Sequence, residues 1–203
     1  LIWYNYIMNK LIKEVKDISL NNFDVDAGIK QRGIADLVED KTIKQCQLSF
    51  ENVKEGRSKK STEDMSFGET LNPNSIWFDI KTHDVHGDFC MPNLISMDKM
   101  FKEIIDVDRE LFYLFQNYKL VDNKVTILEK KIIPYWKLEL DNLSIGNLGT
   151  GQLQIKDMKN PYINENNTKK MFQDEMVQMY ISFLKKLQLK TQSRINHMVY
   201  TYA

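Results

Sequence analysis

Residues 75–82 have the sequence Ser75-Ile76-Trp77-Phe78-Asp79-Ile80-Lys81-Thr82, and this stretch decides the fold. Its aromatic and β-branched residues predict a β-strand. Residues from about Asp64 to Leu71 predict a second strand, and Asn72-Pro73-Asn74 between the two predicts a turn. The two strands are therefore expected to pair as a β-hairpin, with Asp79 and Lys81 near the carboxyl end of the second strand.

Helices and further strands surround this hairpin in the predicted order. Apolar residues at helical spacing predict amphipathic helices, and alternating or β-prone stretches predict strands. Polar stretches at 51–63 and 83–92 predict loops, the first of them mobile. The expected helices cover 5–18, 27–47, 94–105 and 168–198, and the further strands 110–121, 124–134 and 152–158. This order predicts an α/β (α+β) fold, in which helices flank a mixed sheet and the last helix is long.

The length of 203 residues suits a single domain, with residues 1–26 as a helical N-terminal segment that is a candidate dimerisation element. Asn167 or Thr168 is expected to cap the long C-terminal helix. That helix carries an apolar stripe that is either core or dimer surface. The stripe consists of Phe172, Met176, Met179, Phe183 and Leu187.

The composition excludes few classes of protein. The 28 basic and 28 acidic residues cancel, which argues only weakly against nucleic-acid binding, because a metal site needs acids at its centre. No stretch is long and apolar enough to span a bilayer. Leu1-Ile2-Trp3-Tyr4 lacks the basic leader of a signal peptide, and the cysteines Cys46 and Cys90 suit a reducing compartment. We therefore expect a cytoplasmic protein.

The hairpin carries the residues on which the chemistry depends. Residues two apart on a strand point to the same face, so Asp79 and Lys81 are expected to project together. Asp64 lies 15 residues earlier and would return to the same end of the hairpin. Two converging carboxylates repel each other unless a cation lies between them, and oxygen ligands of this kind suit Mg²⁺. Lys81 could orient or deprotonate a metal-bound water, or stabilise negative charge on a phosphorane.

A short acid-x-lysine motif also has a simpler interpretation. The chain holds 28 acidic residues, and Asp157 with Lys159 has the same spacing. Asp79 and Lys81 would then be no more than an exposed ion pair on an edge strand.

The residues around the motif resemble a known family. Ile76–Thr82, followed by Met91-Pro92-Asn93-Leu94-Ile95-Ser96, is similar to type II restriction endonucleases of the PD-(D/E)xK superfamily, and in particular to their EcoRV/HincII-like branch. Gly151-Gln152-Leu153-Gln154-Ile155 resembles a Gln-x-Gln strand of the same branch. The resemblance extends over roughly residues 27–190 and is specific at 76–96.

This resemblance implies a cytoplasmic, prokaryotic homodimer that hydrolyses both strands of duplex DNA with Mg²⁺ and leaves 5′-phosphates. Asp79 and Lys81 match the second acid and the lysine of the motif, and Asp64 matches the first acid, although Glu63 stands where the motif has proline. Asp36 or Glu39 would supply an additional metal-binding acid from an upstream helix. Alternatively, a strand containing Asp36 would itself provide the first acid.

The loop after the lysine enters the major groove in the enzymes that this chain resembles. The expected DNA contacts are Thr82, His83, His86, Asn93, Gln152 and Gln154. The His pair could instead hold zinc with Asp84, Asp88 or Cys90. Two other functions stay open from the sequence: a PD-(D/E)xK nuclease of repair, phage or transposon type, and a catalytically inactive α/β interaction protein.

Overall fold

The computed structural model describes residues 2–20, 22–58, 61–70, 72, 74–87, 92–146, 151–158 and 161–202, without the side chains of 2–7 and 202. No helix in these ranges is long and apolar enough to cross a membrane.

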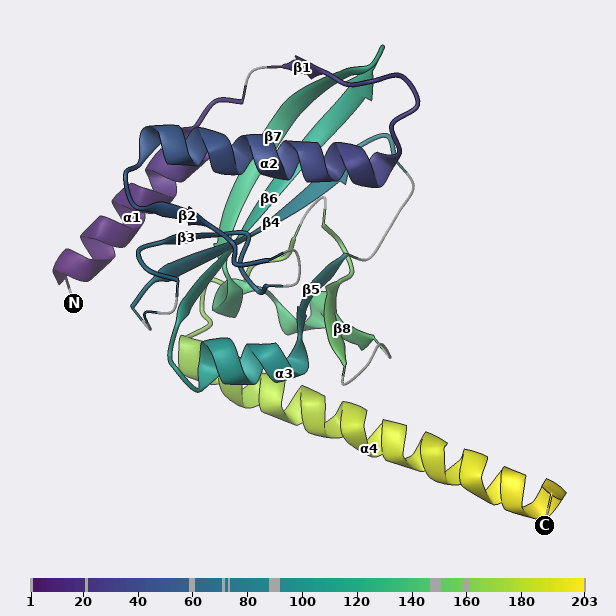
Figure 1. Ribbon diagram of the computed structural model, residues 1–203. Coiled ribbons are helices and arrows are strands. Elements are labelled where there is room, and N and C mark those ends of the chain that lie inside the picture. Colours follow the sequence, from purple (N-terminus) through teal and green to yellow (C-terminus); the bar gives the residue numbers. More distant parts are fainter. Residues whose placement is uncertain are drawn as a thin grey trace.

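A six-stranded mixed sheet forms the centre of the fold (Figure 1). Its order is β1-β7-β6-β4-β3-β2, with β4 and β6 parallel and the other neighbours antiparallel. The strands are β1 Phe23–Asp24, β2 Val53–Glu55, β3 Met65–Phe67, β4 Ile76–Asp84, β6 Glu110–Val121 and β7 Lys124–Pro134. The strand that carries Asp79 and Lys81 is therefore an interior strand. The hairpin of β3 and β4 is confirmed.

Two helices, α1 Ile2–Asp17 and α2 Gln31–Ser49, pack on one face of this sheet. Figure 1 shows α2 lying across the strands. Apolar side chains of both helices meet Phe78 and Ile80 of β4 in one buried cluster, to which α1 contributes Met8 and Val15. The apolar side of α1 therefore packs against the sheet of its own chain.

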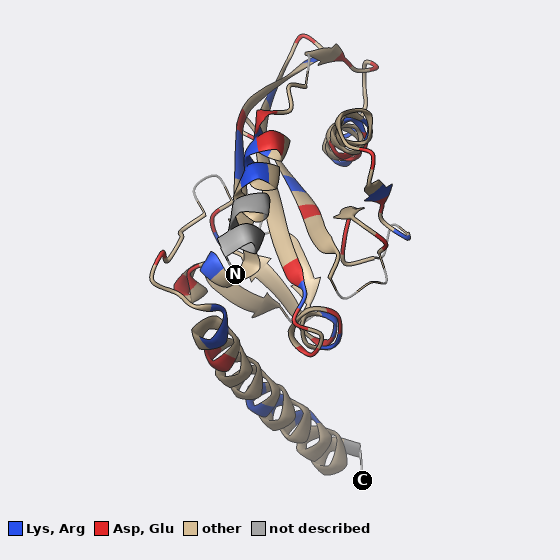
Figure 2. Cartoon of the chain, turned by 90° about the vertical axis from the view of Figure 1, so that its left-hand side faces the viewer, with Lys and Arg blue, Asp and Glu red and all other residues tan. Residues whose placement is uncertain are grey.

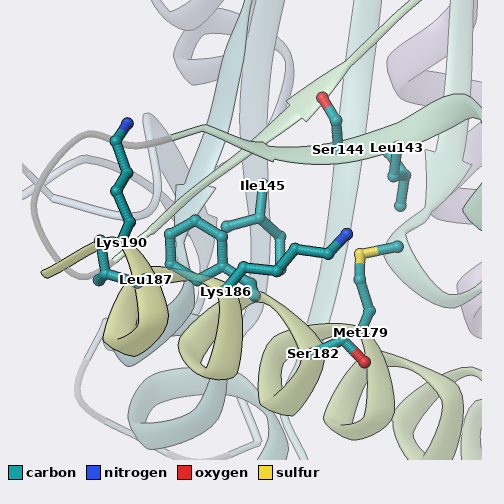
Figure 3. A pocket seen from close by; sticks show the side chains of 9 residues that line it. Leu143, Ser144, Ile145, Met179, Ser182, Lys186, Leu187 and Lys190 are labelled. Carbon is teal, nitrogen blue, oxygen red and sulfur yellow. The ribbon is translucent and has the colours of Figure 1, made fainter. Parts of the chain in front are cut away.

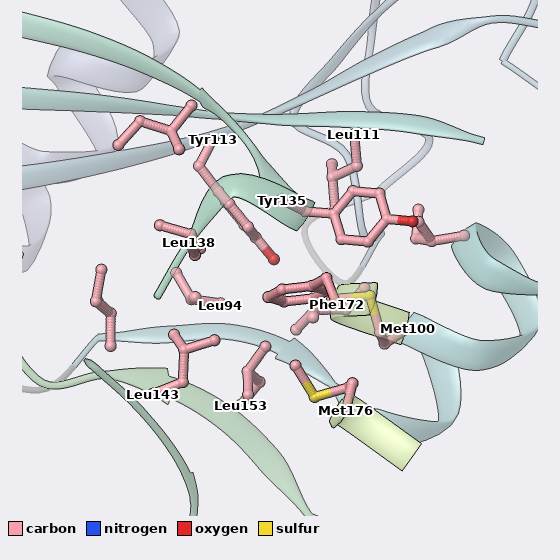
Figure 4. Close-up of a cluster of buried hydrophobic side chains, with 14 of the residues drawn as sticks. Leu94, Met100, Leu111, Tyr113, Tyr135, Leu138, Leu143, Leu153, Phe172 and Met176 are labelled. Atoms are coloured by element: carbon pink, nitrogen blue, oxygen red, sulfur yellow. The ribbon is translucent and has the colours of Figure 1, made fainter. Parts of the chain in front are cut away.

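The opposite face is covered by a second, antiparallel sheet of order β5-β9-β8 and by the later helices. These elements are β5 Asn93–Ser96, α3 Met97–Lys99 with a π-helical turn Met100–Ile105, β8 Leu143–Gly146, β9 Gln152–Ile155 and α4 Lys169–Tyr202. Short 3₁₀ turns, Tyr135–Lys137 and Leu140–Asn142, follow β7. Figure 4 shows the largest core cluster, where Tyr113 of β6, Leu153 of β9 and Phe172 of α4 converge.

The structure corrects several expected elements. The helix predicted from Leu94 is wrong at its start, because residues 93–96 form β5 and the side chain of Ser96 caps the helix that follows. The expected loop at 51–63 contains β2, and the strand predicted for 64–71 is confined to β3. Thr168 caps α4, its hydroxyl accepting from the backbone N–H of Met171 at 3.2 Å.

Replacement of Phe172 by alanine tests how α4 is attached. Phe172 is fully buried and its ring lies edge-on to Tyr135, with 5.6 Å between centroids. We expect Phe172→Ala to lower the free energy of unfolding by about 3–5 kcal/mol in urea titration, because it leaves a cavity. Met171→Ala on the same turn, where the side chain is 48% exposed, should change it by less than about 0.5 kcal/mol. Equal losses would contradict this packing.

Candidate active site

The hairpin creates an open edge of the sheet beside Asp79. Strand β3 pairs with β4 only up to Phe78, whose carbonyl accepts from the N–H of Asp64 at 2.9 Å. The carboxylate of Asp64 then accepts from the N–H of Ile80 at 2.6 Å, in the place of a further strand residue. Strand β4 continues to Asp84 beyond this point. Asp64 therefore returns to the same end of the hairpin as Asp79, as the sequence predicts.

Asp79 and Lys81 form a buried ion pair at this edge. The Lys81 ammonium donates to Oδ1 of Asp79 at 2.5 Å, and only 3% of the Asp79 side chain and 19% of the Lys81 side chain are exposed. The interpretation as an exposed pair on an edge strand is therefore wrong. Oδ2 of Asp79 is buried and makes no hydrogen bond.

The burial of this pair perturbs both groups. Burial raises the pKa of Asp79 well above its ordinary value, Lys81 opposes the shift and Asp64 adds to it. For Lys81, burial favours the neutral amine, but the carboxylates of Asp79, Asp64 and Glu39 together raise its pKa. Lys81 therefore remains an ammonium at neutral pH, beside carboxylates that repel one another.

Helix α2 adds a third carboxylate. Glu39 lies close enough to Asp64 and Lys81 for both to affect it, and its pKa is raised to about 8 by burial first and by Asp64 next. The helix is fixed on the sheet next to this turn, because the buried amide of Gln116 on β6 donates to the hydroxyl of Thr42 at 3.0 Å. Asp36 lies on α2 and not on a strand, so the alternative with a strand around Asp36 is wrong.

These side chains line one polar cavity of about 510 Å³, between α2, β4 and the segment before β3. The lining includes Arg32, Asp36, Glu39, Asp64, Asp79 and Lys81. In the described part of the chain, no three His, Cys, Asp or Glu side chains are placed to hold a metal ion by themselves. The unpartnered oxygen of Asp79 beside Asp64 nevertheless fits Mg²⁺, which binds through one or two carboxylates and completes its shell with water and phosphate oxygens.

The segment that carries Asp64 is held by contacts that the sequence did not predict. Arg57 forms a two-point salt bridge with Glu63, with distances of 2.9 and 3.3 Å, and the Glu63 side chain is fully buried. Gly56 donates from its N–H to the carbonyl of Asp64, and a Cβ on Gly56 would lie 2.3 Å from the carbonyl oxygen of Glu63. The guanidinium of Arg109 stacks on Trp77, 3.8 Å from the ring centroid. The sequence contains one sign of these contacts, because Glu63 stands where the motif has proline.

The expected DNA contacts fall on strands of two separate sheets, and His86 lies beyond the end of one of these strands. Thr82 and His83 are half-buried on β4, and His86 is exposed beyond its end. Asn93 begins β5, and its side-chain oxygen accepts from the amide of Gln154 on β9 at 2.9 Å. Gln152 pairs with Ser96 in the same small sheet. Asp88 and Cys90 of the zinc alternative, and Met91 of the resemblance, lie outside the described residues.

The salt bridge between Arg57 and Glu63 gives a stability prediction. Arg57→Met leaves the buried carboxylate of Glu63 without its main partner, so we expect a loss of about 1–3 kcal/mol in the free energy of unfolding. The double variant Arg57→Met/Glu63→Gln removes that charge and should be more stable than Arg57→Met alone. Urea titration of both single variants and the double variant measures the coupling. If the loss in the double variant equals the sum of the two single losses, Arg57 and Glu63 are not coupled and the prediction is wrong.

The comparison with solved structures agrees with the fold. No family model matches the sequence, and no curated protein matches it either. Among solved structures, the chain is similar to the NlaIV restriction endonuclease, with a TM-score of 0.52 and 12% sequence identity. The match covers 81% of this chain and 71% of that chain. The chain therefore has a restriction-endonuclease-like fold, and its branch within that fold is not determined by this similarity.

Proposed function

We propose that this chain is a type II restriction endonuclease, which uses Mg²⁺ to hydrolyse phosphodiester bonds in both strands of duplex DNA and leaves 5′-phosphates. The observation that carries the proposal is the buried pair of Asp79 and Lys81, next to Asp64 at the point on β4 where β3 stops pairing with it. The restriction-endonuclease-like fold supports it. We assign the chain to the EcoRV/HincII-like branch of the PD-(D/E)xK superfamily on the resemblance of Ile76–Thr82 and of the following Met91–Ser96 in the sequence.

Five side chains of the cavity have a role in this proposal. Asp79, through its unpartnered oxygen, and Asp64 would hold the metal, with Glu39 and Asp36 as additional ligands from α2. Bound there, Mg²⁺ would polarise the phosphodiester and lower the pKa of a water. Lys81 remains charged beside Asp79, which favours a role in stabilising negative charge at the phosphorus over a role as a base.

The substrate is duplex DNA, and the active form is a two-fold homodimer. Each copy would supply one active centre to one strand of a palindromic site. We assign base contacts to Thr82, His83, His86 and Asn93, and to Gln152 and Gln154. Side chains of these types read base edges, and Asn suits adenine in particular.

Plasmid cleavage tests the function directly. Purified protein with supercoiled plasmid and Mg²⁺ should give discrete fragments with 5′-phosphate ends. Asp79→Asn and Lys81→Met should each reduce the cleavage rate at least about 10²-fold, because each removes a group that acts on the reacting phosphate.

The chain offers matched controls for both substitutions. Glu129 and Lys131 have the same acid-x-lysine spacing on β7, 3.5 Å apart, with 50% and 31% of their side chains exposed. The Glu129→Gln and Lys131→Met variants should cleave plasmid at the same rate as the unmodified chain. A smear in place of fragments would identify a nuclease without tight specificity. An intact plasmid across a range of salt and metal conditions would refute the proposal.

Metal binding has a readout that does not depend on cleavage. A divalent ion that binds only the folded chain raises its melting temperature. A tenfold excess of Ca²⁺ or Mg²⁺ over the dissociation constant contributes about 1.4 kcal/mol, which corresponds to roughly 3–6 °C for a chain of this size. Asp79→Asn should abolish this shift, whereas Glu129→Gln should retain it. The same shift in both variants would exclude Asp79 as a ligand.

A further inference from the structure

Helix α4 extends well beyond the domain on which it begins. It contains 34 residues, and Figure 1 shows it projecting away from both sheets toward the C-terminus. Its first half packs inward through Phe172 and Met176, which are fully buried. From Gln188 to Thr201 every residue is exposed. The outer half of the helix therefore has no packing partner within the described chain.

The outer half is a poor candidate for a stable isolated helix. Thr191, Ser193, Ile195, Asn196 and Val199 all have low intrinsic helix propensity. Short helices are marginal in water, and helices in proteins are stabilised mostly by the packing of an apolar face. Hence α4 needs a partner along this part of its length.

A second stripe, in which five of seven residues are apolar, runs along α4 on the side away from the domain. Its members recur at alternating spacings of three and four residues, which is the heptad pattern of a coiled coil. The stripe consists of Ile181, Gln188 and Ile195 at the a positions and Val177, Leu184, Thr191 and Met198 at the d positions. All seven are exposed, Ile195 and Met198 by 50% and 57%.

The inner side of the helix is already covered. Met179, Phe183 and Leu187 face β8 across a cavity of about 430 Å³, where they lie with Leu143 and Ile145 (Figure 3). These helix residues occupy the f, c and g positions of the same heptads, so the a/d stripe points away from β8.

We propose that the a/d stripe of α4 pairs with the same stripe of a second copy of this chain, as a parallel, in-register coiled coil. Isoleucine at a with leucine at d favours two strands, and Ile181 with Leu184 follows this pattern. In register, the amide of Gln188 meets its own copy, and a single polar residue at an a position specifies register and oligomeric state.

No charged residue occupies the a/d stripe of α4. No acidic residue follows Glu175, and Figure 2 shows basic residues along the outer part of the helix. Lys186 and Lys190 occupy the f and c positions, away from the seam, whereas Lys185 and Arg194 flank it at e and g positions. Parallel pairing places Arg194 of one copy next to Val199 of the other. Residues at g of one copy lie next to residues at e of the other, and none of these pairs joins two like charges.

Pairing through α4 would form the homodimer of the proposed function. The interface itself does not depend on that function; only its role in DNA cleavage rests on the proposed function. A parallel pair places both domains at the same end of the coiled coil, as two active centres on one duplex require. Helix α1 is the weaker candidate for this interface, because Met8 and Val15 already pack against the sheet of their own chain.

The mass of the intact chain in solution tests the interface. Light scattering should give twice 24.0 kDa for the unmodified chain and for Leu189→Glu, which changes an exposed leucine at position b, off the stripe. Leu184→Glu introduces a charge at position d and should give the monomer mass at the same concentration. Leu184 is exposed, so circular dichroism should show that the domain remains folded.

Oxidative cross-linking tests the direction of pairing. In a parallel, in-register pair the two copies of residue 188 approach within disulfide distance. Gln188→Cys should form a covalent dimer, whereas Leu189→Cys should match the background of the unmodified chain. A non-covalent dimer without cross-linking at 188 would overturn parallel pairing.

The remaining outcomes separate this inference from the proposed function. A monomeric unmodified chain, or a dimer that persists in Leu184→Glu, would overturn the interface even if the chain cuts DNA. A dimer that depends on Leu184 but leaves plasmid intact would support the interface and refute only the nuclease function.

Discussion

The arrangement of the candidate site depends on the burial of Asp79 beside Lys81 on β4. Removing two charged groups from water costs several kcal/mol for each, and their attraction offsets this only with close geometry. The contact of 2.5 Å supplies that geometry for one oxygen of Asp79, while the other remains without a hydrogen bond. A buried oxygen without a hydrogen bond is unusual in a folded protein and marks this position as a functional site.

The elements around the pair hold repelling groups together. Asp64 is fixed through its own carboxylate and through the Arg57–Glu63 salt bridge one residue before it. Glu39 is fixed because the turn of α2 next to it is anchored by Thr42 on Gln116. Without these contacts, mutual repulsion would favour an arrangement in which the carboxylates separate into solvent. The stability of the domain therefore holds together the carboxyl groups to which a cation would bind.

The sequence was sufficient for the parts of this site that depend on local periodicity. The alternation of β4 placed Asp79 and Lys81 on one face, and the hairpin returned Asp64 to them. The sequence predicts helix for residues 94–96, which form part of β5, because a short apolar run such as Leu94-Ile95 fits a buried strand and a helix equally well. The Arg57–Glu63 contact could not be predicted, because its partners belong to a polar segment without periodicity. Strands as short as β1 and β8 leave no periodic signal.

Helix α4 shows a limit of a different kind. Its sequence contains two apolar stripes, and periodicity alone does not show which of them is core. The structure separates them, because the stripe of Phe172 and Met176 is buried by β-strands of the same chain and the stripe of Leu184 and Ile195 is not. An exposed stripe with a heptad period over three heptads cannot be explained by the packing of one chain. A periodic, mostly apolar stripe that no part of its own chain covers indicates a contact with another molecule. The simplest such contact is with a second copy of the same chain.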